Sequence, residues 1–199
     1  MFQTRKPLIL ASGSPRRREL LARLSIDFEV IVPQVDETGQ AGESPEAYVL
    51  RMARLKAAAV GAAHAGSWVV AADTIVILDG DVLTKPGGRR EAVDMLMRLS
   101  GRQHEVRTAW CLSCDAEGVC LSDSCVSRVR FRTFGRDWAK AYVDTGEPMD
   151  KAGGYGIQER GGVLVERIDG SYSNVVGLPL SELVGLLEEH RIVSPRSAL

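Results

Sequence analysis

An aspartate inside an apolar run is the first feature of the sequence that points to chemistry. Asp73 lies within residues 68–78, where almost every other side chain is apolar, and the small residues Ala71 and Ala72 precede it. An unpaired carboxylate in such surroundings is costly. Asp73 must therefore be protonated, paired with a cation, bound to a metal, or placed at a strand end facing a cleft. The ordinary alternative is a structural ion pair with Lys or Arg.

Three further charged residues could complete a site around Asp73. Glu37 would add the carboxylate oxygens that Mg²⁺ or Mn²⁺ prefers, although an acid in a loop is usually just solvated. Lys56 and Lys85 would supply point charges for phosphate groups. Lys85 stands directly before Pro86, on a turn whose backbone is fixed, whereas Lys56 could equally be an ordinary exposed lysine on a helix.

The segment 8–21 has the pattern of a strand, a tight turn and a helix start. Residues 8–11 are apolar, Ser12 and Ser14 flank a glycine, and Pro15 suits the first turn of a helix with Ser14 as its N-cap. The next three residues, 16–18, are arginines, which oppose the helix dipole unless an anion binds there. Backbone N–H groups, hydroxyls and guanidinium groups together predict a phosphate site. The alternative is a solvated basic helix start.

Other reaction classes lack the residues that they need. His64 and His190 lie near expected helix ends and His104 begins an expected strand, which disfavours a His-based triad or a zinc hydrolase. Ser12 and Ser14 have no evident base partner, so nucleophilic serine chemistry is disfavoured.

Four cysteines form a cluster in the sequence, at positions 111, 114, 120 and 125. The first pair has the spacing of half a zinc site, but the second pair is spaced differently and no histidine lies inside the cluster. We therefore interpret these residues as structural thiols, with a zinc site as the less favoured alternative.

Composition limits the classes of partner. The chain has 199 residues, 45% hydrophobic and 26% charged, with a formal net charge of -1. No global basic field favours nucleic acid or a membrane surface, and no apolar run approaches the ~20 residues that span a bilayer. The N-terminus leads straight into the first expected strand, without a signal-peptide pattern. We expect a cytoplasmic protein.

The length allows one or two domains, and no stretch has the character of a domain-separating linker. We expect an α/β protein with a single domain over 1–193 and a loose tail over 194–199. The glycine-rich segment 146–162 has too few apolar residues to predict a core element. Strands are expected at 8–11, 28–32, 68–78, 82–83, 106–112, 119–134 and 163–168, and helices from 15, over 45–66, 90–99 and 136–143, and from 179, with a polar turn at 170–174.

At this point a set of short motifs resembles a known family. They are residues 11–17 (ASGSPRR), 35–37 (VDE), 54–57 (RLKA), 71–74 (AADT), 84–86 (TKP), 100–104 (SGRQH), 146–153 (GEPMDKAG), 155–158 (YGIQ) and 171–179 (SYSNVVGLP). Taken together and in this order, from residue 8 to about 190, they are similar to the Maf family of nucleotide pyrophosphatases. Gly154 and Glu159 depart from the usual pattern, outside the named site residues.

The resemblance implies a mixed β-sheet flanked by helices, with two lobes around a central cleft, similar to the inosine triphosphate pyrophosphatases. It implies metal-dependent hydrolysis of a nucleoside triphosphate to the monophosphate and pyrophosphate, a house-cleaning activity linked in the family to arrest of cell division. Asp73 corresponds to the family's proton acceptor. Arg16, Thr74 and Gln158 correspond to the branch that acts on dTTP and UTP, whereas a sister branch acts on 7-methyl-GTP.

These expectations give a mechanism with named roles. Glu37 and Asp73 hold Mg²⁺ or Mn²⁺, and Asp73 activates the attacking water. Gln158 pairs with the O4 and N3–H edge of uracil or thymine, in canonical or modified pyrimidine nucleotides. The phosphates are held by Ser12, Ser14, Arg16, Arg17, Lys56 and Lys85.

Two alternatives come from other functional classes. A nucleotide-sensing regulator of septum formation would bind without turnover, but such a binder gains nothing from two acids near phosphates unless a metal is present. Phosphoryl transfer to an acceptor lacks a Walker-type loop here. A homodimer is the default expectation for a soluble oligomer.

Overall fold

The computed structural model describes residues 1–196, which form two compact units. Unit 1 comprises Met1–Asp73, Thr108–Cys125 and the residues from Gly177 onward, and unit 2 comprises Thr74–Arg107 and Val126–Val176. Strands β4, β6 and β7 each contain a unit boundary, and a fourth boundary follows Val176, at the end of α5.

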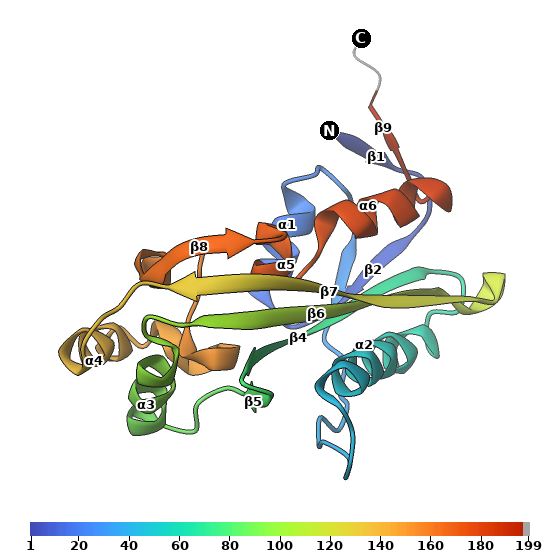
Figure 1. Cartoon of the computed structure of the whole chain (residues 1–199). Helices are drawn as coiled ribbons and strands as arrows, with labels where there is room; N and C mark the ends of the chain where they lie inside the picture. Colours follow the sequence, from blue (N-terminus) through green and yellow to red (C-terminus); the bar gives the residue numbers. More distant parts are fainter. Residues whose placement is uncertain (197–199) are drawn as a thin grey trace. The chain divides into compact units, whose positions relative to one another are not determined.

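The strands and helices that the sequence predicts occur in the predicted order, together with two terminal strands and one short helix that it did not predict (Figure 1). The strands are β1 (Phe2–Thr4), β2 (Leu8–Ala11), β3 (Glu29–Ile31), β4 (Trp68–Leu78), β5 (Asp81–Leu83), β6 (Gln103–Cys114), β7 (Val119–Phe131), β8 (Val165–Asp169) and β9 (Val193–Pro195). The α-helices are α1 (Pro15–Ala22), α2 (Pro45–Gly61), α3 (Arg89–Leu99), α4 (Arg136–Asp144), α5 (Tyr172–Val176) and α6 (Leu180–Glu189). Short 3₁₀ segments are η1 (Asp115–Glu117), η2 (Glu147–Asp150), η3 (Ala152–Gly154) and η4 (Arg160–Leu164).

The main sheet has the order β3-β2-β4-β6-β7-β8, with β5 paired to β4. β2 pairs in parallel with both β3 and β4, whereas β5 is antiparallel to β4 and β8 is antiparallel to β7. This confirms the predicted mixed sheet with helices. Because β2 and β3 are parallel, the loops that follow them both leave from the carboxyl ends of the strands, where ligands bind in open α/β sheets.

The starts of α1 and α2 follow from paired capping signals. Ser14 precedes Pro15 and Ser44 precedes Pro45, and each serine side chain accepts a hydrogen bond from a backbone N–H in the first turn of its helix. The first turn of α1 contains no acidic residue. The arginines at 16–18 therefore lie at a helix N-terminus without a compensating carboxylate on that turn.

The two terminal strands pair with each other. β1 and β9 form a two-stranded antiparallel sheet in which Phe2 lies opposite Pro195 and Gln3 opposite Ser194, and Figure 1 shows them side by side. The expectation of a loose tail from residue 194 is therefore wrong for Ser194 and Pro195. The sequence analysis did not predict β9, because its partner strand β1 lies at the opposite end of the sequence. Residues 197–199 lie outside the described part.

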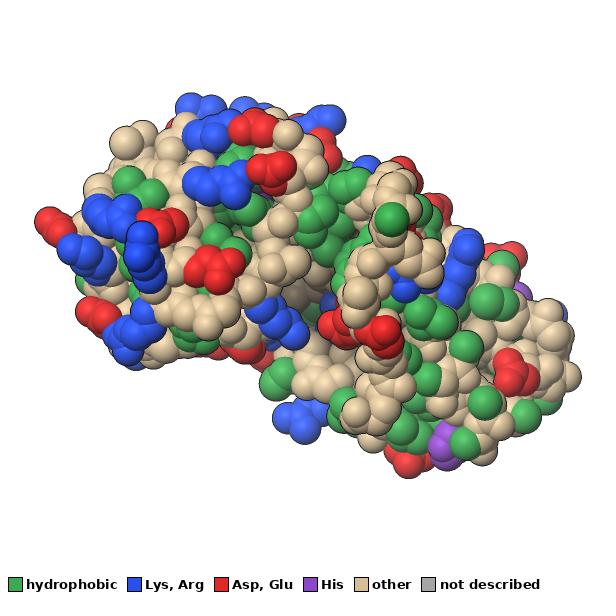
Figure 2. Space-filling view, turned by 90° about the horizontal axis from the view of Figure 1, so that it is seen from below, with side chains coloured by type: hydrophobic (Ala, Val, Ile, Leu, Met, Phe, Trp, Pro, Cys, Tyr) green, Lys and Arg blue, Asp and Glu red, His purple; other side chains and the backbone are tan. Residues whose placement is uncertain are grey.

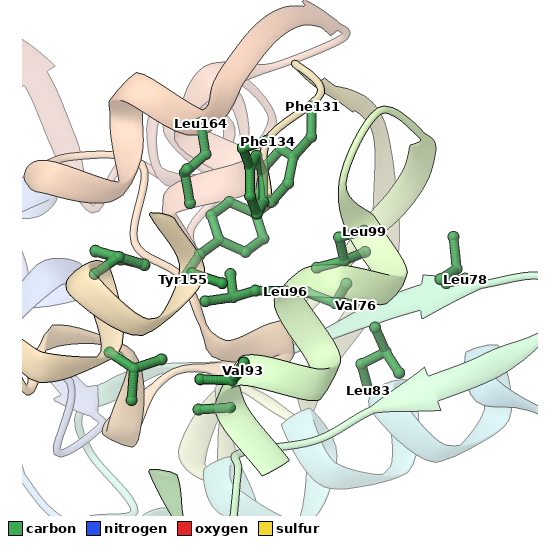
Figure 3. Close-up of a cluster of buried hydrophobic side chains, with 14 of the residues drawn as sticks. Val76, Leu78, Leu83, Val93, Leu96, Leu99, Phe131, Phe134, Tyr155 and Leu164 are labelled. Atoms are coloured by element: carbon green, nitrogen blue, oxygen red, sulfur yellow. The ribbon is translucent and has the colours of Figure 1, made fainter. Parts of the chain in front are cut away.

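Unit 2 has its own hydrophobic core, which is built around aromatic side chains (Figure 3). Tyr155 is 6% exposed and its ring lies 4.7 Å from that of Phe131, between centroids, in an edge-to-face arrangement. The expectation that 146–162 contributes nothing to the core is wrong at Tyr155. Glycines explain how the segment packs so closely: Gly153 has a φ of 70°, and a Cβ there would lie 3.0 Å from a methyl group of Val76.

Four local expectations differ from the observed elements. The helix expected over 45–66 ends at Gly61. The strand expected at 163–168 begins at Val165, because residues up to Leu164 form a 3₁₀ turn. The polar turn at 170–174 overlaps α5, whose Asn174 is buried and donates to the carbonyl of Val106. β7 ends at Phe131 rather than at residue 134.

The four thiols lie in separate surroundings. Cys111 and Cys120 approach to 3.9 Å between sulfurs, while Cys114 contacts the carbonyl of Ala65 and Cys125 contacts Glu182. All four cysteines are free, and two of them are buried. Their surroundings are those of structural thiols, as expected.

The surface carries charges of both signs. On the face shown in Figure 2, Lys and Arg side chains are interspersed with Asp and Glu side chains. Within residues 1–196, no helix combines the length and apolar character required to cross a bilayer.

His104 is a buried titratable residue of unit 2. It is 2% exposed, its Nε2 lies 2.8 Å from the Tyr155 hydroxyl, and its ring packs edge-on against Phe131. Burial lowers the pKa of His104 from 6.5 to about 4. The imidazole is therefore neutral in the folded protein at physiological pH.

This burial predicts a loss of stability in acid. Between pH 6.5 and about 4 the unfolded chain binds a proton at this position and the folded protein does not, so the free energy of unfolding falls as the pH falls. The shift corresponds to about 3 kcal/mol across that window. Urea unfolding at several pH values should show a shallower dependence in His104→Gln, while His64→Gln should keep the wild-type dependence. An unchanged pH dependence in His104→Gln would contradict the assignment.

Candidate active site

A lysine bridging two carboxylates is the central feature of unit 1. Lys56 Nζ lies 2.6 Å from Asp73 Oδ1 and 2.6 Å from Glu37 Oε1. The side chains of Lys56 and Asp73 are only 11% and 13% exposed, and that of Glu37 is 51% exposed. The interpretation of Lys56 as an ordinary exposed helix lysine is therefore wrong. Asp73 has the cationic partner that its apolar surroundings require.

Three consecutive parts of the chain, the loop after β3, helix α2 and strand β4, bring these charges together. The last parallel pair between β2 and β4 joins Ala11 to Ala71, so Asp73 projects from β4 just beyond the end of β2. Glu37 lies in the loop that follows β3, at the same edge. α2 then carries Lys56 on a buried helical position. The site thus lies beyond the carboxyl ends of parallel strands, where ligands bind in open α/β sheets.

The turn between β2 and α1 is organised around Ser12 and Arg17. Ser12 Oγ accepts hydrogen bonds from the backbone N–H of Ser14 at 3.2 Å and from an Arg17 guanidinium nitrogen at 3.3 Å. Arg17 Nε also donates to the carbonyl of Gly177 at 2.7 Å. The guanidinium is therefore fixed from two sides before any ligand arrives, which reduces the entropy lost on binding an anion.

Electrostatics couple this turn to the acids. Burial lowers the pKa of Arg17, and the neighbouring Arg16 acts in the same direction, while Asp73 and Glu37 oppose the shift. Arg17 remains charged at neutral pH, because a guanidinium group is too weak an acid to lose its proton in a protein. Two cationic side chains, Arg17 and Lys56, thus act on the same pair of carboxylates.

A second set of contacts, which the sequence analysis did not identify, holds the loop of Glu37 against α2. The Tyr48 hydroxyl donates to the backbone carbonyl of Glu37 at 3.0 Å. Arg51 donates to the carbonyl of Thr38 at 3.1 Å and binds both carboxylate oxygens of Glu43 at 2.6 Å. The 48/51 spacing on a helix places both side chains on one face, which was the available signal. Glu37 is therefore held by its backbone as well as by Lys56.

The structure brings most, but not all, of the predicted site residues into one unit. Thr74 follows Asp73 on β4 and begins unit 2. Lys85 is exposed after β5, and Gln158 lies partly exposed in a turn of unit 2. The functional roles of all these residues stay predictions. The residues placed in unit 1 are Ser12, Ser14, Arg16, Arg17, Glu37, Lys56 and Asp73.

The donor set fits a divalent metal that is completed by substrate. Within residues 1–196, no group of three or more His, Cys, Asp or Glu side chains forms a protein-only metal cage. The carboxylates of Glu37 and Asp73 nevertheless converge on one ammonium group at 2.6 Å each, so their oxygens could face one small cation. Mg²⁺ is commonly held by one or two carboxylates together with water and substrate phosphates. The residues present match that pattern.

Comparison with known proteins places the chain in a family. Residues 7–190 match the family model "Maf-like protein". The chain is 51% identical over 194 residues to a protein of Desulfotalea psychrophila named dTTP/UTP pyrophosphatase, with 98% of this chain and 100% of that protein covered. It is 50% identical over 188 residues to a protein of the same name from Myxococcus xanthus, with 94% of each covered.

A solved structure supports the same fold. The Ham1 protein of Staphylococcus aureus matches 93% of this chain and 100% of its own, with a TM-score of 0.53 and 16% sequence identity. At that identity the likeness concerns the fold alone. With the family match and relatives near 50% identity over almost the whole length, the chain belongs to the Maf-like protein family.

Proposed function

We propose that this protein hydrolyses dTTP and UTP to the nucleoside monophosphate and pyrophosphate. The observation that carries the proposal is the arrangement in which Lys56 bridges the largely buried Asp73 and the half-exposed Glu37, in the same unit as the fixed guanidinium of Arg17. The names of the relatives at about 50% identity support the reaction and the substrates. Modified pyrimidine nucleotides belong to the same substrate class, which suits a house-cleaning role linked to cell-division arrest.

The phosphates bind at the turn between β2 and α1. Arg17 offers charged donors in a fixed orientation, and the N-terminus of α1 adds partial positive charge. Lys56 has three N–H donors, two of which face Glu37 and Asp73, so the third can donate to a phosphate oxygen. Ser12, Ser14, Arg16 and Lys85 complete the phosphate contacts in this proposal.

Glu37 and Asp73 would hold Mg²⁺ or Mn²⁺. When bound, the cation would neutralise part of the phosphate charge and help to orient the phosphates. The protein itself keeps the two acids from repelling each other, because Lys56 lies between them. The loop of Glu37 keeps its place through Tyr48 and Arg51.

Asp73 is the proton acceptor. A water molecule attacks the α-phosphorus, its proton passes to the Asp73 carboxylate, and the bond between the α-phosphorus and the bridging oxygen breaks to release pyrophosphate. Arg17 and Lys56 neutralise the charge that develops on the phosphate oxygens. Gln158 reads the base, because its amide carries both a donor and an acceptor for the O4 and N3–H edge of uracil or thymine.

The overall reaction is tested by incubating the protein with UTP and Mg²⁺ and analysing the products. Formation of UMP and pyrophosphate in equal amounts supports the proposal. Binding of UTP without any UMP would instead support a cytoplasmic nucleotide-sensing regulator, and UDP with a phosphorylated acceptor would support phosphoryl transfer.

Replacing the proton acceptor should abolish turnover. In Asp73→Asn the side chain keeps its shape but no longer accepts a proton, so we expect kcat to fall on the order of 10³-fold with little change in secondary structure. Product formation and circular dichroism measure the two effects. Asp81→Asn, at an exposed aspartate paired with Arg98, should retain activity. Wild-type turnover in Asp73→Asn would refute its role as the base.

Replacing the base-reading amide should change selectivity more than turnover. In Gln158→Ala we expect the ratio of kcat/KM for UTP over CTP to fall on the order of 10-fold, because the paired hydrogen bonds that distinguish the two bases are lost. Gln103→Ala, at an exposed glutamine in the same unit, is the matched control. An unchanged ratio in Gln158→Ala would show that another group reads the base.

Removing the bridging ammonium should destabilise the metal-free protein. In Lys56→Met, Glu37 and Asp73 face each other without a cation, so we expect the free energy of unfolding in EDTA to fall by about 1–2 kcal/mol. Mg²⁺ should then restore more stability than it adds to the wild type. Lys140→Met, at an exposed lysine of α4, should change neither value. Equal stabilities of Lys56→Met and wild type in EDTA would contradict the bridging role.

A further inference from the structure

The carboxylate of Glu147 is bound by three donors of unit 2, one from α4 and two from the backbone at residues 160–161. Its Oε1 accepts from the Tyr142 hydroxyl at 2.7 Å and from the backbone N–H of Gly161 at 3.0 Å, while its Oε2 accepts from the backbone N–H of Arg160 at 3.1 Å. Two successive amides thus converge on one carboxylate. Hydrogen bonds to an ionised acceptor are stronger than those between neutral groups.

The hydroxyl of Tyr142 also binds the backbone a few residues before Arg160 and Gly161. The backbone N–H of Gly156 donates to the Tyr142 oxygen at 3.0 Å, and Tyr142 is only 3% exposed. Burial raises the pKa of Tyr142, and the neighbouring Glu147 adds to the increase, so the phenol stays protonated and donates to Glu147. Tyr142 and Glu147 therefore bind both ends of the segment 156–161, which we call the 156–161 turn.

Steric contacts show how tightly the turn is closed. A Cβ on Gly161 would lie 2.4 Å from the Tyr142 hydroxyl oxygen and 2.5 Å from the carbonyl oxygen of Gly156. A Cβ on Gly162 would lie 2.8 Å from the carbonyl oxygen of Ile157. Only glycine permits this approach of backbone to backbone at position 161. The 156–161 turn is therefore tightly closed, and its hydrogen bonds to Tyr142 and Glu147 hold it in place.

Gln158 lies at the tip of this turn. Its side chain is partly exposed, and among residues 1–196 it makes no side-chain hydrogen bond that would orient it. The direction of its amide therefore depends on the backbone of the turn. A displacement of about 1 Å at a group that must form paired hydrogen bonds can cost as much as its loss.

We propose that Tyr142 and Glu147 are positioning residues for base selection, which fix the 156–161 turn so that the Gln158 amide meets the edge of a uracil or thymine base. This inference rests on the proposed function, in which Gln158 reads the base. Neither residue touches the base itself. Both act through the backbone of the turn.

A merely structural role makes a different prediction. Loss of a buried hydrogen bond would then lower stability and weaken every nucleotide alike, leaving the preference between bases unchanged. A positioning role lowers the preference for uracil over cytosine. The ratio of affinities separates the two roles, and the products UMP and CMP allow it to be measured without turnover.

The experiment compares two tyrosine variants of the same core. Tyr142→Phe removes the hydroxyl that contacts Gly156 and Glu147, whereas Tyr155→Phe removes a buried hydroxyl that contacts His104 instead. Calorimetric affinities for UMP and CMP should show a ratio reduced on the order of 10-fold in Tyr142→Phe and the wild-type ratio in Tyr155→Phe. Thermal unfolding should show a loss of stability in both variants.

Two further variants sharpen the result. Glu147→Gln keeps the length of the side chain but turns one of two accepting oxygens into a donor, so we expect a reduced ratio there as well. In a Gln158→Ala background, Tyr142→Phe should reduce the ratio no further, because the amide that it positions is already absent. Independent, additive effects would show that Tyr142 does not act through Gln158.

The outcomes separate this inference from the function on which it rests. Wild-type protein that prefers UMP to CMP but forms no UMP from UTP would defeat the proposed hydrolysis and leave the positioning role supported by the variants. The inference is overturned if the wild type has no preference, if Tyr142→Phe and Glu147→Gln keep the wild-type ratio, or if Tyr155→Phe loses as much of it as Tyr142→Phe.

Discussion

The ammonium of Lys56 between two carboxylates is the interaction on which the arrangement of unit 1 depends. Asp73 lies on an apolar strand and Glu37 on a solvated loop, so the two acids have different reasons to be where they are. The buried acid needs a counter-charge, and the exposed acid needs something to hold it still. One lysine on α2 meets both needs, since its charge offsets Asp73 while its length reaches Glu37.

Each unit holds its candidate binding groups by fixing backbone rather than side chains alone. In unit 1 the carbonyl of Glu37 receives the Tyr48 hydroxyl, and in unit 2 the amides of Gly156 and Gly161 meet Tyr142 and Glu147. In both cases a tyrosine on a helix contacts a loop whose tip carries a polar side chain. A tyrosine on a rigid helix thus restricts the conformation of a segment that has no regular hydrogen-bonding pattern.

The sequence predicted those parts of the fold that depend on neighbouring residues. The Ser-Pro pairs marked the starts of α1 and α2, and the apolar run 68–78 matched β4. The apolar surroundings of Asp73 required a cation from elsewhere, and the observed contact with Lys56 is the ion pair that the sequence offered as one alternative, while the reactive role of Asp73 stays a prediction. The resemblance to the Maf family added the roles that spacing alone left open.

What the sequence did not predict depends on contacts between distant segments. Tyr155 lies in a glycine-rich stretch without a strong apolar pattern, yet it joins the core because glycines such as Gly153 let the backbone approach Val76. Glu147 looks like an ordinary loop acid until the amides that bind it are seen. Ser194 belongs to a strand only because Gln3 lies opposite it. The helix and strand propensities of neighbouring residues do not reveal such contacts with distant segments.

The pairing of Gln3 with Ser194 also affects how the chain is made. During vectorial synthesis β1 leaves the ribosome before every other strand, while β9 is the last of the strands to follow. The backbone edge of β1 therefore stays without its partner until β9 has been synthesised. Such an open edge is a template for pairing with other nascent chains, and a chaperone that shields it would act on β1 during the synthesis of all the residues that separate the two strands.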